Sequence, residues 1–235
     1  MGSRIKFSFY VSVVSVFAAL HAVLAAVPGV WRSLVIMIVP VEGVVLGPKA
    51  GFLAALIGAG VGRVLRPRPG LDPVFGVGEA VGAACSGLAF KGMWRRVLLL
   101  CTPMLAAYFL HPVGRRLPAW CLWDVYVALA LAPLSGLLAR RTSDGRENPR
   151  ALTLTLALSA FIGVEADVLT RIFIFIPLGF YALMGIPEGA LPAIWVAGAV
   201  ETPIESVLSV AASTVVGVPL LLALERGGVL HWPLT

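Results

Sequence analysis

Charge is scarce in this sequence. Of its 235 residues 13% are charged and 59% are hydrophobic, whereas about a quarter of the residues of a soluble domain are charged. The chain has too little polar surface to cover itself in water, which excludes an ordinary soluble domain. In lipid every backbone N–H and C=O must be bonded within a helix or around a closed barrel. The apolar runs are long and continuous, unlike the alternating segments of about ten residues that build barrels, so we expect an all-α bundle.

Motifs of nucleotide, metal and hydrolase chemistry are also missing. No GxxxxGK[ST] loop is present to hold ATP phosphates, and no GxSxG nucleophile turn occurs. The histidines His21, His111 and His231 lack the spacing of metal ligands, and we expect them at membrane interfaces. We therefore predict no cofactor, no metal and no catalysis. An intramembrane hydrolase whose Ser and His meet only by folding stays a distant alternative.

Cysteine is rare, and acidic residues are outnumbered by basic ones. Cys85, Cys101 and Cys121 are odd in number and have no CxxC spacing, which argues against a disulfide framework or a metal knuckle. The 18 Lys and Arg exceed the 12 Asp and Glu, but they gather in short loops between apolar runs, as on the cytoplasmic face of membrane proteins. We expect a cell-membrane protein without nucleic-acid binding.

The apolar runs predict a single membrane domain over residues 1–235. They lie at 7–27, 33–46, 50–65, 73–90, 97–110, 119–139, 151–184 and 191–224. The first run exceeds the roughly 7 to 15 apolar residues of a signal peptide, so it is interpreted as a span with its N-terminus inside. The last two runs contain Pro177, Pro192, Pro203 and Pro219, so we expect kinked or partly interfacial helices there.

The number of crossings depends on the Gly47-Pro48 pair. Basic loops at 91–96 and 140–150 indicate the cytoplasmic face and place both termini inside. If 33–65 is one span, the loop with Arg63, Arg66 and Arg68 is cytoplasmic and six crossings result, with 73–90 re-entrant. If the Gly-Pro pair is a cytoplasmic turn, that loop is external and eight crossings result.

Acids inside apolar runs are the clearest functional signal. They are Glu42, Glu79, Glu165, Asp167, Glu201 and Glu205, accompanied by the basic Arg171. Each costs about 2.5 to 3.5 kcal/mol at mid-bilayer, which disfavours a position facing lipid. Asp167 and Arg171 share a helix face at i,i+4 and could neutralise each other privately. Glu201 and Glu205 have the same spacing and would repel each other, which favours a polar pocket.

Small residues recur on two predicted helices. Ala18, Ala22 and Ala26 repeat every four residues, and Gly58 and Gly62 form a GxxxG. Both patterns offer a flat surface for close helix packing. The alanine stripe is either a surface for a partner protein or a seam within the bundle.

Several of these segments together resemble a known family, the substrate-binding S components of energy-coupling factor (ECF) vitamin transporters. The stretch 39–56, VPVEGVVLGPKAGFLAAL, is similar to the family's apolar segment, Gly-Pro turn and following helix. The sequence FGVGE, ending at Glu79, resembles the loop-into-helix of riboflavin-type members, and Ala166-Asp167 with Phe175-Ile-Pro177 is similar to their fifth helix. Pro203 to Arg226 resembles the last helix, and the alanine stripe resembles the AxxxA seam that docks on the coupling subunit. The resemblance covers about two thirds of the chain.

The resemblance implies a fold, a function and a site. It favours eight crossings, with 97–139 an extra hairpin, and a subunit that binds a vitamin or related small molecule for ATP-driven uptake without chemistry. Its partners would be a membrane coupling subunit, docked at Ala18, Ala22 and Ala26, and paired ATPases. The predicted ligand contacts are Glu79, Asp167, Arg171, Trp195 and Glu205, which favour a cationic or amine-bearing compound, although Trp195 could instead belong to an interfacial belt. A stand-alone proton-coupled secondary transporter is the alternative function.

Overall fold

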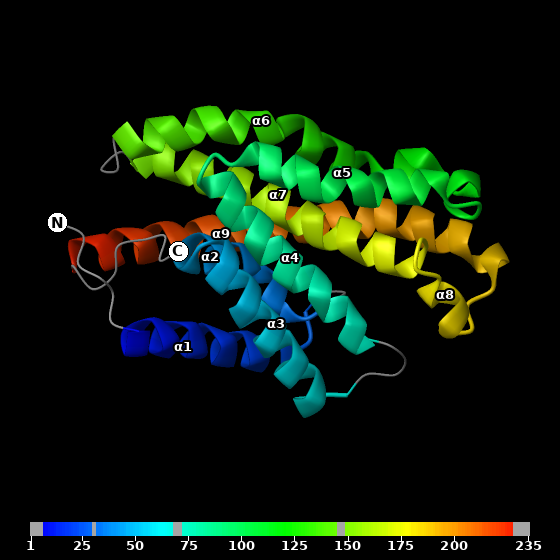
Figure 1. The fold of residues 1–235 in the computed structure, drawn as a ribbon, viewed down its shortest axis with the longest axis horizontal. Helices are drawn as coiled ribbons and strands as arrows, with labels where there is room; N and C mark the ends of the chain where they lie inside the picture. The colour runs from blue at the N-terminus through cyan, green and yellow to red at the C-terminus, as the bar shows by residue number, and fades with distance from the viewer. Residues whose placement is uncertain (1–6, 30–31, 68–71, 145–148, 228–235) are drawn as a thin grey trace.

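The computed structural model describes residues 7–29, 32–67, 72–144 and 149–227 (Figure 1). The α-helices are α1 (Phe7–Ala26), α2 (Val39–Leu46), α3 (Pro48–Leu65), α4 (Asp72–Phe90), α5 (Trp94–Leu110), α6 (Trp123–Asp144), α7 (Pro149–Phe175), α8 (Phe180–Leu183) and α9 (Leu191–Arg226). Short 3₁₀ turns lie at Leu34–Met37, Gly114–Arg116, Ala119–Leu122 and Glu188–Ala190. The described residues form no β-strand, so the prediction of an all-α bundle is confirmed.

Within the part of the chain that the structure describes, five segments are long and apolar enough to cross a membrane. They are Ser8–Ala26, Pro48–Leu65, Ala119–Thr142, Pro149–Phe175 and Glu188–Arg226. The helix at Val74–Phe90 is apolar but shorter. Lipid can replace water around such helices because their backbone groups are bonded internally.

The chain reverses at Gly47. This residue has φ 83° and separates α2 from α3, and Pro48 begins α3, where a missing N–H costs nothing. A Cβ at Gly51 would lie 2.9 Å from the Cα of Gly43, so the two helices fold back against each other. Residues 33–65 therefore do not form the single span that the six-crossing alternative requires.

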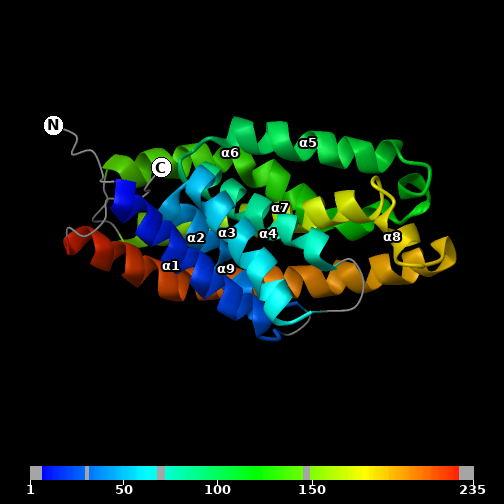
Figure 2. The same ribbon diagram turned by 60° about the horizontal axis from the view of Figure 1, so that its bottom comes forward.

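Helix α7 lies at the centre of the bundle. It contacts α4, α9, α6, α5 and α2, and α5 and α6 pack together beside it (Figures 1 and 2). The close approach of α4 and α7 depends on Gly82 and Gly163, because a Cβ on either glycine would lie within 2.8 Å of the other's carbonyl oxygen. Small residues thus let two backbones meet where larger side chains would hold them apart.

The alanine stripe of α1 is largely internal. Ala18 and Ala22 are 7% and 5% exposed, and Ala26 is partly buried. Cβ atoms at Gly58 and Gly62 of α3 would lie 2.7 and 2.8 Å from the carbonyl oxygens of Ala18 and Ala22. The stripe and the GxxxG of α3 therefore pack against each other, which corrects the prediction that Ala18 and Ala22 form an open docking surface.

The prolines of the last two runs act differently from one another. Pro177 follows the end of α7 at Phe175, and Pro192 lies in the first turn of α9. Pro203 and Pro219 lie inside α9, which continues through both to Arg226. At 1.5 Å per residue this helix is about 54 Å long, well beyond a hydrocarbon core of about 30 Å.

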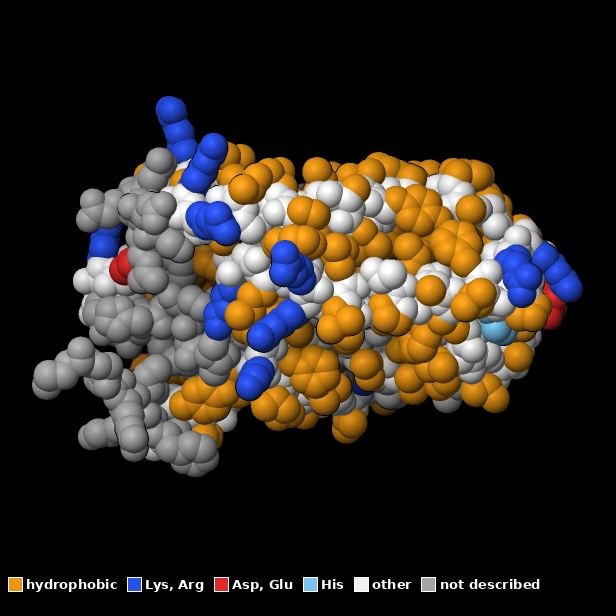
Figure 3. Space-filling view, turned by 45° about the horizontal axis from the view of Figure 1, so that its top comes forward, with side chains coloured by type: hydrophobic (Ala, Val, Ile, Leu, Met, Phe, Trp, Pro, Cys, Tyr) orange, Lys and Arg blue, Asp and Glu red, His pale blue; other side chains and the backbone are white. Residues whose placement is uncertain are grey.

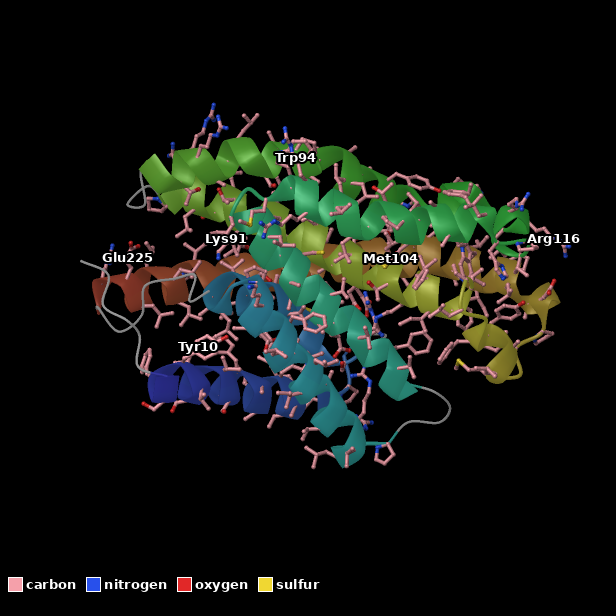
Figure 4. All side chains as sticks on the ribbon, in the orientation of Figure 1. Tyr10, Lys91, Trp94, Met104, Arg116 and Glu225 are labelled. Carbon is pink, nitrogen blue, oxygen red and sulfur yellow. The ribbon has the colours of Figure 1, made fainter. Side chains whose placement is uncertain are left out.

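Basic side chains lie at both ends of the bundle (Figure 3). One end, here called the basic end, is marked by Lys91 (Figure 4). Lys49 and Arg96 lie near Lys91, Arg140 lines a hollow beside it, and Arg150 lies in the first turn of α7. The start of α1 and the end of α9 lie in this half (Figure 1). Arg116 lies at the opposite end (Figure 4). Between the basic side chains of the two ends, apolar side chains cover much of the face seen in Figure 3. Burial, and after it the charges of Arg96 and Lys49, lowers the pKa of Lys91.

Candidate functional site

Glu79 of α4 is the hub of a buried ion-pair network. One of its oxygens, Oε1, accepts from Arg171 at 2.9 Å and from Arg63 at 2.8 Å. The other, Oε2, accepts from Arg63 at 3.2 Å and lies 3.1 Å from Nε2 of His21. Glu79 is 3% exposed, so a single buried carboxylate connects α1, α3, α4 and α7.

His21 lies between two carboxylates in the bundle core. Its Nδ1 is 2.8 Å from Glu42, and its Nε2 faces Glu79. Both His21 and Glu42 are fully buried, so the expectation of an interfacial histidine is wrong for His21. A neutral imidazole has a single N–H, so His21 can donate to both acids only when both of its ring nitrogens are protonated.

Asp167 of α7 connects this hub to the loop before α2. It accepts from Arg171 Nε at 2.7 Å and from Arg32 Nη1 at 2.9 Å. Arg32 also pairs with Glu205 of α9 through Nε, and its backbone N–H donates to the same carboxylate at 3.0 Å. The pair of Asp167 and Arg171 is therefore not private, because each partner has a second ion pair.

The glycines of the FGVGE segment make room for these charges. A Cβ at Gly78 would lie 2.1 Å from Asp167 Oδ1, and a Cβ at Gly76 would lie 2.9 Å from Arg63 Nη1. Side chains at either position would push an ion pair apart. The motif thus has a local physical reason: two glycines admit neighbouring charges, and the glutamate that follows pairs with them.

A cavity of about 340 Å³ adjoins the network. Five segments line it: the loop before α2, the starts of α4, α6 and α9, and the end of α7. The lining residues are Arg32, Phe75, Cys121, Leu122, Asp124, Val168, Arg171, Ile172, Phe175, Ile194, Trp195, Gly198, Glu201, Thr202 and Glu205. These segments lie away from the basic end (Figure 1). The volume is within the usual range for small-molecule sites.

Aromatic rings form one part of the wall. Phe175 and Trp195 stack with ring centroids 6.1 Å apart and planes 19° apart, and Phe75 lies 6.4 Å from Phe175. Behind them, Tyr108 of α5 stacks on Trp195 at 6.1 Å. Trp195 is 7% exposed, so it packs inside the bundle and does not belong to an interfacial belt.

A second acidic group lies on the α6, α7 and α9 side of the cavity. Asp124 accepts from Thr202 at 2.5 Å, and Glu165 accepts from Ser206 at 2.5 Å. Both acids are 1% exposed, and no described residue donates a hydrogen bond to Glu165 Oε2. Neither acid forms an ion pair among the described residues.

The structure brings the five predicted ligand residues into one region. Arg171, Trp195 and Glu205 line the cavity, while Glu79 and Asp167 lie behind the wall and bind Arg171. The carboxylates of Glu79, Asp167 and Glu205 are each paired with an arginine. Their spacing along the sequence does not reveal these pairs.

Sequence reasoning missed four residues of this region. Arg32 was not considered, Asp124 was not among the acids noted, and Arg63 was assigned to a loop although it lies in the last turn of α3. His21 was placed at an interface. The one available signal was the polar character of His21 and Asp124 inside apolar runs.

Arg68 lies outside the described residues, and Arg66 donates to the carbonyl of Ala26 at 3.0 Å.

Fold and site together define an α-helical bundle with helices apolar enough to cross a membrane, and with a largely apolar cavity that adjoins buried ion pairs. No protein-family model, curated protein or solved structure matches the chain. The function is therefore argued from the site itself.

Proposed function

We propose that this protein is a membrane-embedded substrate-binding subunit, of the S-component type, that captures a small water-soluble compound for ATP-driven uptake. The observation that carries the proposal is the cavity of about 340 Å³ lined by aromatic rings and charged groups. Its polar wall is held by buried ion pairs from α1, α3, α4, α7 and α9. A fixed, charged cavity within an apolar bundle suits recognition of a polar solute.

The proposed orientation follows from the two ends. Lys and Arg concentrate in the cytoplasmic loops of membrane proteins, so the basic end faces the cytoplasm and the cavity faces outward. In this orientation both termini lie on the cytoplasmic side of the cell membrane. The crossings are eight: α1, the 3₁₀ turn with α2, α3, α4, α5, α6, α7 and α9. The second of these is short, but every residue of α2 is buried, so protein rather than lipid surrounds it.

The proposed partners are a membrane coupling subunit and paired ATPases. The subunit itself performs no chemistry on the ligand. Because Ala18 and Ala22 pack against α3, docking uses another surface of the protein. The α5–α6 hairpin, Trp94–Leu110 and Trp123–Asp144, is an addition to the six-helix pattern of the family that the sequence resembles.

A specific observation favours the second candidate, a proton-coupled carrier. Asp124 and Glu165 are buried acids without a basic partner among the described residues, and such acids are used as proton sites in transporters. We keep this as the alternative that the following experiment decides.

Reconstitution separates the two candidates. Compounds that co-purify with the protein are first identified by mass spectrometry, and the labelled compound is then offered to liposomes. We expect accumulation only with the coupling subunit, the ATPases and ATP, and none when the Walker lysine of the ATPases is replaced. Accumulation by the protein alone, driven by a proton gradient, would establish the carrier instead.

A further inference from the structure

Acids outnumber bases around the cavity. Among the described residues the region holds seven carboxyl groups, those of Glu42, Glu79, Asp124, Glu165, Asp167, Glu201 and Glu205, and four basic groups, those of His21, Arg32, Arg63 and Arg171. The bases pair with Glu42, Glu79, Asp167 and Glu205. Among the described residues, Asp124, Glu165 and Glu201 form no ion pair, although the charge of Arg32 acts on Asp124 and Glu165 from a distance.

These three acids lie on one side of the cavity. Glu201 and Asp124 line its wall, and Thr202, which follows Glu201 in α9, donates to Asp124. Glu165 lies behind them, bound to Ser206 one helical turn further along. Burying a carboxylate without a counter-charge is costly in a low-dielectric interior. The arginines of the cavity wall are paired with Glu79, Asp167 and Glu205, so a bound cation can supply the ion pair that Asp124 and Glu201 lack.

The stacked rings of Phe175 and Trp195 form another wall of the same cavity. Such a surface favours a flat ring by offset or edge-to-face stacking. A cation near an aromatic face gains further attraction. Acidic and aromatic walls together are complementary to a molecule that carries both a ring and a cationic nitrogen.

We propose that the cavity binds an aromatic compound with a protonated amine, its ammonium group held by Glu201 and Asp124 and its ring against Phe175 and Trp195. The inference rests on the proposed function, in that the cavity is the binding site. It assigns recognition of the cation to two acids that pair with no arginine among the described residues. Glu79 and Asp167 instead hold the arginines in position.

The test uses a matched pair of probes, tryptamine and its hydroxyl analogue indole-3-ethanol, with the purified full-length protein in lipid nanodiscs. Equilibrium dialysis of each labelled probe gives its affinity. We expect tryptamine to bind about ten- to a hundredfold more tightly, the factor that corresponds to one charge-assisted hydrogen bond. Glu201→Gln should remove most of that preference, and Asp124→Asn should lower it too.

Glu188→Gln is the matched control, because Glu188 is an exposed acid away from the cavity wall. This variant should keep the full preference for tryptamine over indole-3-ethanol. Glu201 is only partly buried, so its variant tests the idea even if Asp124→Asn fails to fold. Equal binding of the two probes, preference for indole-3-acetate, or no binding of tryptamine at millimolar concentration would overturn the inference. Amine binding without ATPase-dependent uptake would sink only the S-component role.

Discussion

Single residues in this protein act through charges that meet across helices. Glu79 contacts His21, Arg63 and Arg171, which belong to three other helices. Gly78, one position earlier, leaves the space that Asp167 occupies. Removing one member of such a network leaves the others as buried charges without partners, and that loss is large even where the intact pair contributes little net stability.

Asp167→Asn should therefore destabilise the protein strongly. Asp167 is paired with both Arg32 and Arg171, and breaking a buried pair costs about 3 to 5 kcal/mol. The surface pair of Arg116 and Glu188, 74% and 53% exposed, supplies the control, since such pairs contribute about 0 to 1 kcal/mol. Thermal unfolding in detergent compares Asp167→Asn with Glu188→Gln. Similar midpoints for the two variants would show that the network is not structural.

Helices pair here where small residues face one another. The α1–α3 seam brings Ala18 and Ala22 against Gly58 and Gly62, and α4 meets α7 in the same way through Gly82 and Gly163. Lipid offers apolar surface as good as leucine, so tight van der Waals contact between backbones drives such pairing.

Ala22→Trp should destabilise the isolated protein. The ring has no space beside α3, where the carbonyl of Ala22 already lies 2.8 Å from the Cβ position of Gly62, and overpacking costs about 1 to 3 kcal/mol or more. Val23→Trp is the control, because Val23 is 58% exposed and points away from the seam. The measurements are thermal stability and capture of the coupling subunit. Lost capture with unchanged stability would instead make the stripe a docking surface.

At the scale of the whole molecule, successive helices run between the two ends of the bundle. The end at which a loop lies decides whether that loop is external. The reversal at Gly47 puts the end of α3 in the same half as the end of α1, where Arg66 donates to the Ala26 carbonyl. The turn before Arg96 lies in the basic half. If the basic end is cytoplasmic, these two arginines lie on opposite sides of the membrane.

A cysteine at Arg66 should react with an impermeant thiol reagent in intact cells, whereas one at Arg96 should react only after lysis. Both arginines are exposed. The background must lack Cys85, Cys101 and Cys121, although all three are buried and unpaired by disulfides. The readout is the extent of labelling before and after permeabilisation. Labelling of Arg66→Cys only after lysis would contradict the eight-crossing orientation.

Composition and periodicity alone determined the class and most elements of this protein. Scarcity of charge excludes a soluble domain, and long apolar runs can satisfy their backbone only as helices. The predicted break at Gly47-Pro48 is confirmed because both residues act locally, glycine through its positive φ and proline through its missing N–H. Acids inside apolar runs likewise indicated a polar interior. A carboxylate is costly in contact with lipid whichever residue it later pairs with, so it must face the inside of the bundle.

Only the tertiary structure decided which charges pair and which remain without partners. Arg32 is distant in sequence from Asp167 and Glu205, yet it binds both, and His21 lies between acids of α2 and α4. Ala18 and Ala22 have the spacing of a docking surface, but α3 covers them. Sequence specifies the residue types and their faces along one helix. Pairing depends on distances between helices, which close packing sets only when the whole bundle has formed.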